Sequence, residues 1–242
     1  MSLEEFRDRL QRQKEQDKPN TVFPEGCYGA SNAPLVFVGP SPGGGEVDAE
    51  YSARNFDANG AYWNFEFNEP FEEWSNGFRT SLKPIVETVL QLPLSEGSNK
   101  LFAFVNFDWI QNPDSSQVPM SRVNEGKAVV LKVLKEIQPR IIVALDTKAY
   151  KALVQVIKID YCLVDLKSQN VRIRTASPNS YHREVKAHLI EGHGELNGSV
   201  FLKSPQHPAR IYNADYAERV SITLRKAYEA VVNSEELCVH LD

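Results

Sequence analysis

The sequence predicts an α/β fold with a parallel sheet, because three mainly apolar runs alternate with stretches of helical periodicity. The runs at 35–38, 100–107 and 140–146 have the length and the branched or aromatic residues of strands buried on both faces. Alternation of such strands with helices is typical of βαβ units. The 242 residues are enough for one large domain with a substantial core, and no shift in composition divides them. We therefore expect a single domain, residues 1–242.

Composition and charge narrow the class of protein. No apolar run approaches the roughly 18 residues that a membrane helix requires, so we expect no membrane partner. A net charge of −5 argues against a large positive surface for nucleic acid, but it is compatible with a local basic groove. Cys27, Cys162 and Cys238 are too few and too scattered for a disulfide framework or a thiolate metal site. The N-terminus lacks the apolar core of a signal peptide, so we expect a cytoplasmic monomer, or a nuclear one in a eukaryote.

The first half of the chain contains a central strand and two long connections. An amphipathic helix is predicted over 3–16, followed by a turn-rich approach to the strand at 35–39. That strand ends in a loop of glycines and prolines, 39–45, whose bare backbone suits close approach to a ligand; the alternative is a flexible turn. The connection 47–77 carries eight aromatic residues, and we interpret this aromatic insertion as a folded flap beside the glycine loop.

The second half continues the alternation of helix and strand. Helices are predicted over 81–90, from Ser121 as the N-cap to 137, and from 147 onward. A second insertion, 159–198, contains two short strand candidates at 161–166 and 171–176 and a helical pattern at 183–191. A last strand at 200–203 and an amphipathic helix at about 213–232 complete the chain.

Three strands therefore end in loops of unusual chemistry, 39–45, 106–114 and 204–210. The carboxyl ends of parallel strands meet at one edge, so these loops are expected to lie together. They offer bare backbone amides, the amide of Asn106 and a histidine between prolines, His207, a set that suits a planar heterocycle with carbonyl and imide groups. The alternatives are that Asn106 only caps a loop and that His207 is only a rigid-turn residue. The other histidines match no compact ligand motif, so we expect no metal.

Together these three motifs resemble the uracil-DNA glycosylase superfamily. GPSPG at 39–43, VNF at 105–107 and HPA at 207–209 stand in that superfamily's order and spacing, and residues 139–145 with the following helix are similar to its third strand and helix. The nearest likeness is to the branch that often carries an iron–sulfur cluster, but three cysteines cannot supply its four thiolates. The resemblance implies a three-layer αβα domain around a four-stranded parallel sheet, without a cofactor. Its partner would be single- or double-stranded DNA containing a modified base.

The resemblance also implies a reaction, hydrolysis of the N-glycosidic bond of uracil or another altered base flipped out of DNA during repair. Asn106 would read the base edge, and His207 would hydrogen-bond a base carbonyl as negative charge develops. The remaining implied roles are base binding by Gly39, Gly43 and a stacking Phe78, and entry of Arg210 and Ile211 into the duplex. Phe78 as a core residue and Arg210 as an ordinary surface residue are the alternatives.

The first motif departs from active relatives, which commonly carry Asp, Glu or Asn to orient the attacking water. This chain has Pro40 and Ser41 there, and a serine hydroxyl orients water but is a poor base near neutral pH. Two other functions therefore stay open. One is a base-binding protein of the same fold with weak or no hydrolysis, and the other is a hydrolase or binder of small nucleotides.

Overall fold

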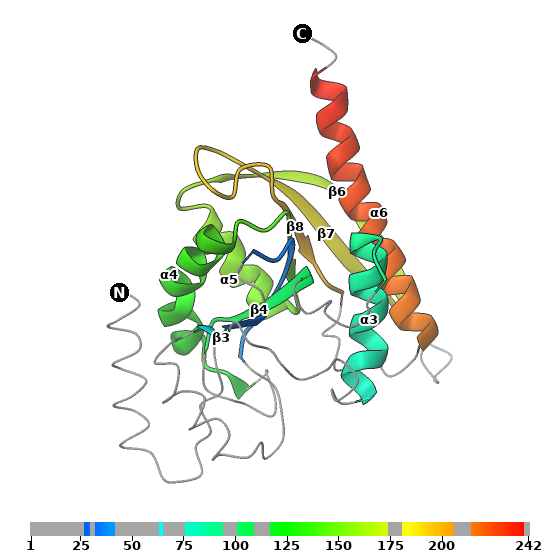
Figure 1. Cartoon of the computed structure of the whole chain (residues 1–242), viewed down its shortest axis with the longest axis horizontal. Helices are drawn as coiled ribbons and strands as arrows, with labels where there is room; N and C mark the ends of the chain where they lie inside the picture. The colour runs from blue at the N-terminus through cyan, green and yellow to red at the C-terminus, as the bar shows by residue number, and fades with distance from the viewer. Residues whose placement is uncertain are drawn as a thin grey trace.

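One mixed sheet with helices on both faces organises the described part of the chain (Figure 1). The computed structural model describes residues 27–29, 32–41, 63–64, 76–93, 101–108, 117–173, 181–205 and 214–239. The strands are β1 (Cys27–Gly29), β2 (Leu35–Gly39), β3 (Trp63–Asn64), β4 (Phe102–Asn106), β5 (Ile141–Ala144), β6 (Cys162–Ile173), β7 (Tyr181–Glu191) and β8 (Val200–Lys203). The helices are α3 (Asn76–Leu90), α4 (Met120–Ile137), α5 (Thr147–Ile157) and α6 (Ala214–Val239). The predicted helix 3–16 and most of the aromatic insertion 47–77 lie outside the described residues.

The sheet has the order β3-β1-β4-β2-β5-β8-β7-β6. Its four adjacent central strands, β4, β2, β5 and β8, are parallel, as the apolar runs predict. The expectation of a sheet with only four parallel strands is wrong, because eight strands take part in the described sheet and the outer pairings include antiparallel ones. The long β6–β7 hairpin extends one side through β8, and β1 extends the other through β4. The α/β class is confirmed, and the sheet is mixed.

The central strands are buried on both faces because their side chains alternate between two cores. In β2, Val36 and Val38 join a cluster with α4 and α5, whereas Leu35 and Phe37 join a cluster with α3 and α6. Figure 1 shows the same division, with α4 and α5 on one side of the sheet and α3 and α6 on the other. In each core the strand side chains pack directly against helix side chains. The four central strands and their helices therefore hold the strand ends in fixed positions.

The helices begin and end differently from the expected bounds. α3 begins at Asn76, so Pro84 lies inside the helix rather than in its first turn. α4 begins at Met120 after an extended Pro119, and no side-chain cap bond forms there, so the prediction of Ser121 as N-cap is wrong. α6 continues to Val239, beyond the predicted end. Among the helices of the described ranges, none has the length and apolar character of a membrane span.

The second insertion forms a long antiparallel hairpin instead of two short strands and a helix. β6 is one strand of 12 residues, with an irregular register between Leu166 and Gln169. The predicted helix at 183–191 is wrong, since this stretch is β7 and pairs with both β6 and β8. Val185, Ala187 and Leu189 enter the core beside α6 at alternate positions, which is the period of a strand.

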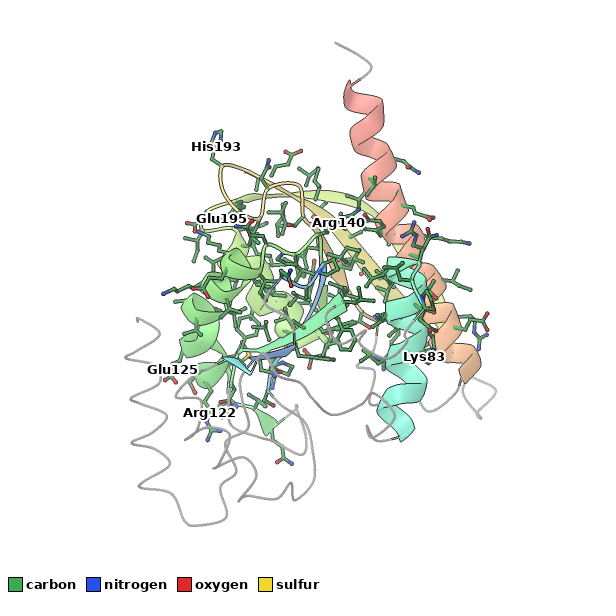
Figure 2. The ribbon with its side chains drawn as sticks, in the orientation of Figure 1. Lys83, Arg122, Glu125, Arg140, His193 and Glu195 are labelled. Atoms are coloured by element: carbon green, nitrogen blue, oxygen red, sulfur yellow. The ribbon has the colours of Figure 1, made fainter. Side chains whose placement is uncertain are left out.

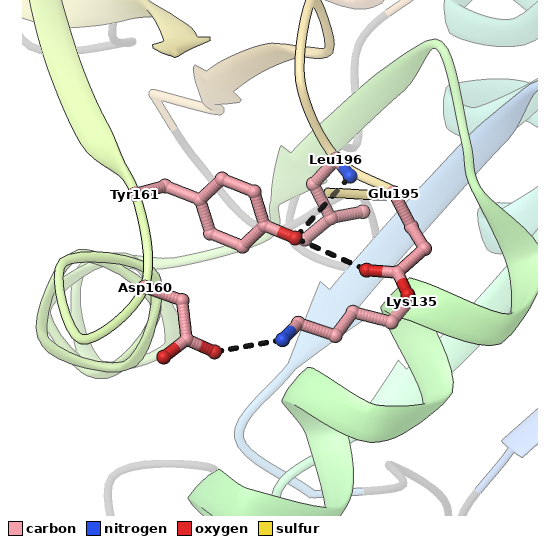
Figure 3. A network of polar contacts seen from close by, with 5 residues as sticks. All are labelled: Lys135, Asp160, Tyr161, Glu195 and Leu196. Carbon is pink, nitrogen blue, oxygen red and sulfur yellow. Dashed lines mark hydrogen bonds and ion pairs between the residues drawn. The ribbon is translucent and has the colours of Figure 1, made fainter. Parts of the chain in front are cut away.

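Polar contacts link the turn between β7 and β8 to the connection between α5 and β6, and that connection to α4 (Figure 3). The Tyr161 hydroxyl donates to Glu195 Oε2 at 3.3 Å, and the Leu196 amide donates to that hydroxyl at 3.5 Å. Lys135 Nζ of α4 lies 2.7 Å from Asp160 Oδ2. This turn precedes β8, so it lies at the amino ends of the parallel strands. The opposite edge carries the ends of β2 and β4, where two of the predicted motifs begin.

Candidate functional site

The candidate site lies at the carboxyl ends of the four parallel strands. Backbone hydrogen bonds continue the ladders past the strand ends, from Leu145 N to Val38 O (2.9 Å) and from Ser204 N to Ala144 O (2.8 Å). The first residues of the following loops are therefore held in register with one another. In Figure 2, Arg122 lies near this edge, and Glu195 lies at the opposite end of the sheet.

Gly39 and Asn106 are direct partners at the ends of β2 and β4. A Cβ atom built on Gly39 would lie 2.6 Å from Asn106 Oδ1, closer than real Cβ contacts come. A glycine is therefore required at position 39 for the Asn106 side chain to occupy its place beside β2. The Asn106 side chain is 4% exposed, and an amide buried this deeply must be hydrogen-bonded. The pairing fixes the position of the amide at the edge of the sheet.

Ser41 lies two residues beyond Gly39 and is also buried, at 6% exposure. Among the described residues, its hydroxyl has no hydrogen-bond partner. Leaving a buried hydroxyl unpaired costs about 1–3 kcal/mol, so such groups in native proteins are usually satisfied by water or ligand. The Ser41 hydroxyl is thus a ready partner for a polar group entering this edge of the sheet.

Asp108 is a buried carboxylate that the motif argument did not single out. Its amide donates to Pro40 O at 2.9 Å, so its backbone lies beside the Pro40–Ser41 segment, and its side chain is 3% exposed. Arg122, in the first turn of α4, lies 3.4 Å from Asp108 Oδ2 and offsets the charge. Burying a carboxylate is costly without such a partner. The available signal was its position two residues past Asn106, the last residue of a buried strand.

Asp146 shows that a carboxylate at this edge can have a purely structural role. It directly follows Leu145, and its Oδ1 accepts a hydrogen bond from Ala149 N at 2.7 Å. This contact is a helix N-cap, which satisfies one of the free amides at the start of α5. Asp146 is therefore assigned to helix capping and not to the candidate site.

The structure brings together three of the residues predicted for the site, namely Gly39, Ser41 and Asn106. Phe78 belongs to the first turn of α3, and the placement of its side chain lies outside the described part. The other predicted residues, Gly43, His207, Arg210 and Ile211, also lie outside the described residues. The described edge thus contributes a buried amide, an unpaired hydroxyl and a carboxylate paired with arginine, which together suit a small polar ligand.

No protein-family model matches this chain, and its sequence matches no curated protein. The three motifs and the geometry of the strand ends are therefore the basis for a function. Within the described ranges, no group of three or more histidine, cysteine, aspartate or glutamate side chains is arranged to hold a metal ion.

Proposed function

We propose that this chain is a DNA glycosylase-like protein that binds uracil or another modified base flipped out of DNA and hydrolyses its N-glycosidic bond. The observation that carries the proposal is the Asn106 amide, buried at a strand end in space that only a glycine at position 39 leaves free. An amide both donates and accepts, which matches the imide edge of a pyrimidine. We further propose that β4, β2, β5 and β8, with the helices on either face, form a uracil-DNA glycosylase-like core.

The proposed reaction breaks the bond between the base nitrogen and the sugar C1′, a water oxygen takes the place of the base, and one proton of that water ends on the released base. Asn106 holds the base, and His207 donates a hydrogen bond to a base carbonyl as the base leaves with negative charge. Such preorganised donors are often the largest catalytic contribution. The Ser41 hydroxyl orients the water. Asp108, whose backbone lies beside Ser41, supplies negative charge near the positive charge that develops on the sugar.

A second function is favoured by the pairing of Asp108 with Arg122. This pairing offsets the charge of the carboxylate at the described edge, and Ser41 is a poor base. A protein with this arrangement would bind a base without hydrolysing its N-glycosidic bond. The test below separates this base-binding function from hydrolysis.

The direct test is excision from oligonucleotides that carry uracil, hypoxanthine or bulky modified pyrimidines. Alkali then cleaves any abasic site, and the fragments are resolved on a denaturing gel. The proposal expects cleavage at one of these bases in single- or double-stranded DNA. Absence of cleavage on every substrate at stoichiometric protein, with tight binding retained, would support the base-binding function. Binding of mononucleotides with no gain from added DNA length would favour a small-nucleotide protein.

A further inference from the structure

Two lysines face each other across neighbouring strands on the β6–β7 side of the sheet. Lys186 of β7 and Lys203 of β8 are direct partners in the antiparallel ladder. Like charges in this position destabilise a sheet. Lys203 Nζ lies 5.7 Å from the centre of the Tyr150 ring, so the lysine lies on the face of the sheet that α5 covers. The pair is an unfavourable arrangement for the folded chain alone.

Lys203 lies over an aromatic cluster, and Lys186 has one ion-pair partner at the surface. The Tyr150 ring beneath Lys203 stacks on Phe201 and His188, and its hydroxyl lies 2.8 Å from His188 Nε2. Lys186 Nζ lies 3.4 Å from Glu184 Oε2 on the same strand. Charges positioned in advance lose little side-chain freedom when they bind a ligand. Lys203 is therefore less free to move than a fully exposed lysine.

Positive charge predominates around Lys203. Burial lowers the pKa of Lys203, and the neighbouring charges of Lys186, Arg183 and Lys151 lower it further, while Glu184 opposes them. Arg183 Nη1 also donates to Pro205 O at 3.1 Å, which ties this cationic group to the chain that leaves β8. An anion bound here would relieve the repulsion among these groups. Three positive side chains and one negative side chain thus act on Lys203, although the whole chain has a net charge of −5.

We propose that Lys186 and Lys203 jointly bind one phosphate of a nucleic-acid backbone, and that Lys151 adds positive charge beside them. The inference rests on the proposed function only in its choice of nucleic acid as the source of the phosphate. β8 ends at Lys203, immediately before the segment 204–210 that carries His207. A strand bound by the lysine pair would therefore pass beside the segment that the proposed function assigns to the flipped base.

The experiment measures binding of a duplex of unmodified bases, by fluorescence anisotropy, over a range of salt concentrations. Each phosphate contact contributes a slope of about 0.9 in log Kobs against log salt, which is about a threefold to fourfold change in affinity between 50 and 200 mM salt. Because the remaining lysine can still neutralise the shared phosphate, we expect Lys186→Gln and Lys203→Gln each to reduce the slope by much less than 0.9. The double variant, which leaves that phosphate without a lysine, should reduce the slope by about 0.9.

The matched control is Lys132→Gln with Lys226→Gln, on exposed positions of α4 and α6, which removes the same charge elsewhere. A fall in slope as large in the control as in the double variant of Lys186 and Lys203 would overturn the inference, as would absence of duplex binding by the wild type. If inorganic phosphate and the duplex raise the melting temperature of the wild type equally, the inference would also be overturned, because the ligand would then be a small anion. As a check on folding, Lys186→Gln should keep the melting temperature without DNA near that of the wild type, because it removes both the repulsion from Lys203 and the exposed ion pair with Glu184. If the wild type shows no excision but its duplex binding has the expected salt slope, only the proposed function is contradicted.

Discussion

At the scale of single residues, the buried amide of Asn106 is expected to decide which base is accepted. Asn106→Ala should remove about 1–3 kcal/mol of discrimination among bases, the value of a good bidentate contact, and leave the fold intact. Single-turnover excision or binding of oligonucleotides with different bases measures this. Asn124→Ala, at an exposed position of α4, is the control. Unchanged preference in Asn106→Ala would show that this amide does not read the base.

The fit between Gly39 and Asn106 predicts a coupling between the two positions. Gly39→Ala should displace the Asn106 amide, because its Cβ would lie 2.6 Å from Oδ1, and overpacking of this kind costs about 1–3 kcal/mol. In an Asn106→Ala background the same change should cost much less. Urea unfolding of the two single variants and the double variant gives this coupling energy. Additive costs would mean that the glycine is required for another reason.

The unpaired hydroxyl of Ser41 predicts a role in placing water. Ser41→Ala should slow single-turnover excision, and Ser41→Asn should maintain or raise the rate, because an amide also orients water. Ser221→Ala is the matched control, since Ser221 is fully buried in α6 and its hydroxyl donates within that helix, to Glu218 O. Equal rates for the wild type and both Ser41 variants would mean that another group places the water.

Part of the site follows from sequence because it depends on local order. Gly39, Ser41 and Asn106 follow or end apolar strands, and parallel strands bring such ends together. Asp108 was not singled out because a carboxylate after a strand usually faces solvent. Its burial depends on Arg122, which is 14 residues away in a helix, and no local pattern records that contact.

At the scale of elements, β7 shows where local pattern is ambiguous. Residues 183–191 place apolar side chains among charged ones at spacings that fit either a helix or a strand. Pairing with β6 on one side and β8 on the other decides for the strand. These pairings are set by the tertiary structure, which overrides a weak helical preference.

The turn that joins β7 to β8 gives a prediction at the same scale. Gly194 has φ of +138°, and a Cβ there would lie 2.7 Å from the Tyr161 hydroxyl, whereas Gly198, with φ of +80°, has nothing within 4 Å. Backbone strain of this kind costs about 1–3 kcal/mol for a residue other than glycine. Gly194→Ala should therefore lower the free energy of unfolding more than Gly198→Ala does. Equal losses, measured by urea unfolding, would show that the Tyr161 network does not restrict this turn.

At the scale of the whole molecule, the sequence predicts the central parallel strands and not the extent of the sheet. The parallel strands are continuous apolar runs with helices between them, so each can be predicted from its own residues. The hairpin strands carry charges such as Asp165 and Lys186, and β1 is only three residues long. Such strands take their places by pairing with edges that already exist. The count of eight in the described sheet therefore follows from the assembled fold.

The stability of the whole fold should depend on pH through His188. This histidine is 5% exposed between Tyr150 and Phe201, and burial lowers its pKa below the ordinary value of about 6.5, although the nearby Asp165 carboxylate opposes that shift. As the pH falls through about 6.5, the unfolded chain takes up a proton at this position before the folded chain does. The free energy of unfolding therefore decreases with falling pH, by up to about 1.4 kcal/mol per pH unit, until the pH reaches the pKa of His188 in the folded chain.

His188→Gln should flatten the dependence of the free energy of unfolding on pH, measured by urea unfolding between about pH 7.5 and 5.5. His193→Gln, at an exposed position of the turn, should not flatten it. A His188→Gln curve parallel to that of the wild type would show that this buried imidazole does not couple protonation to folding.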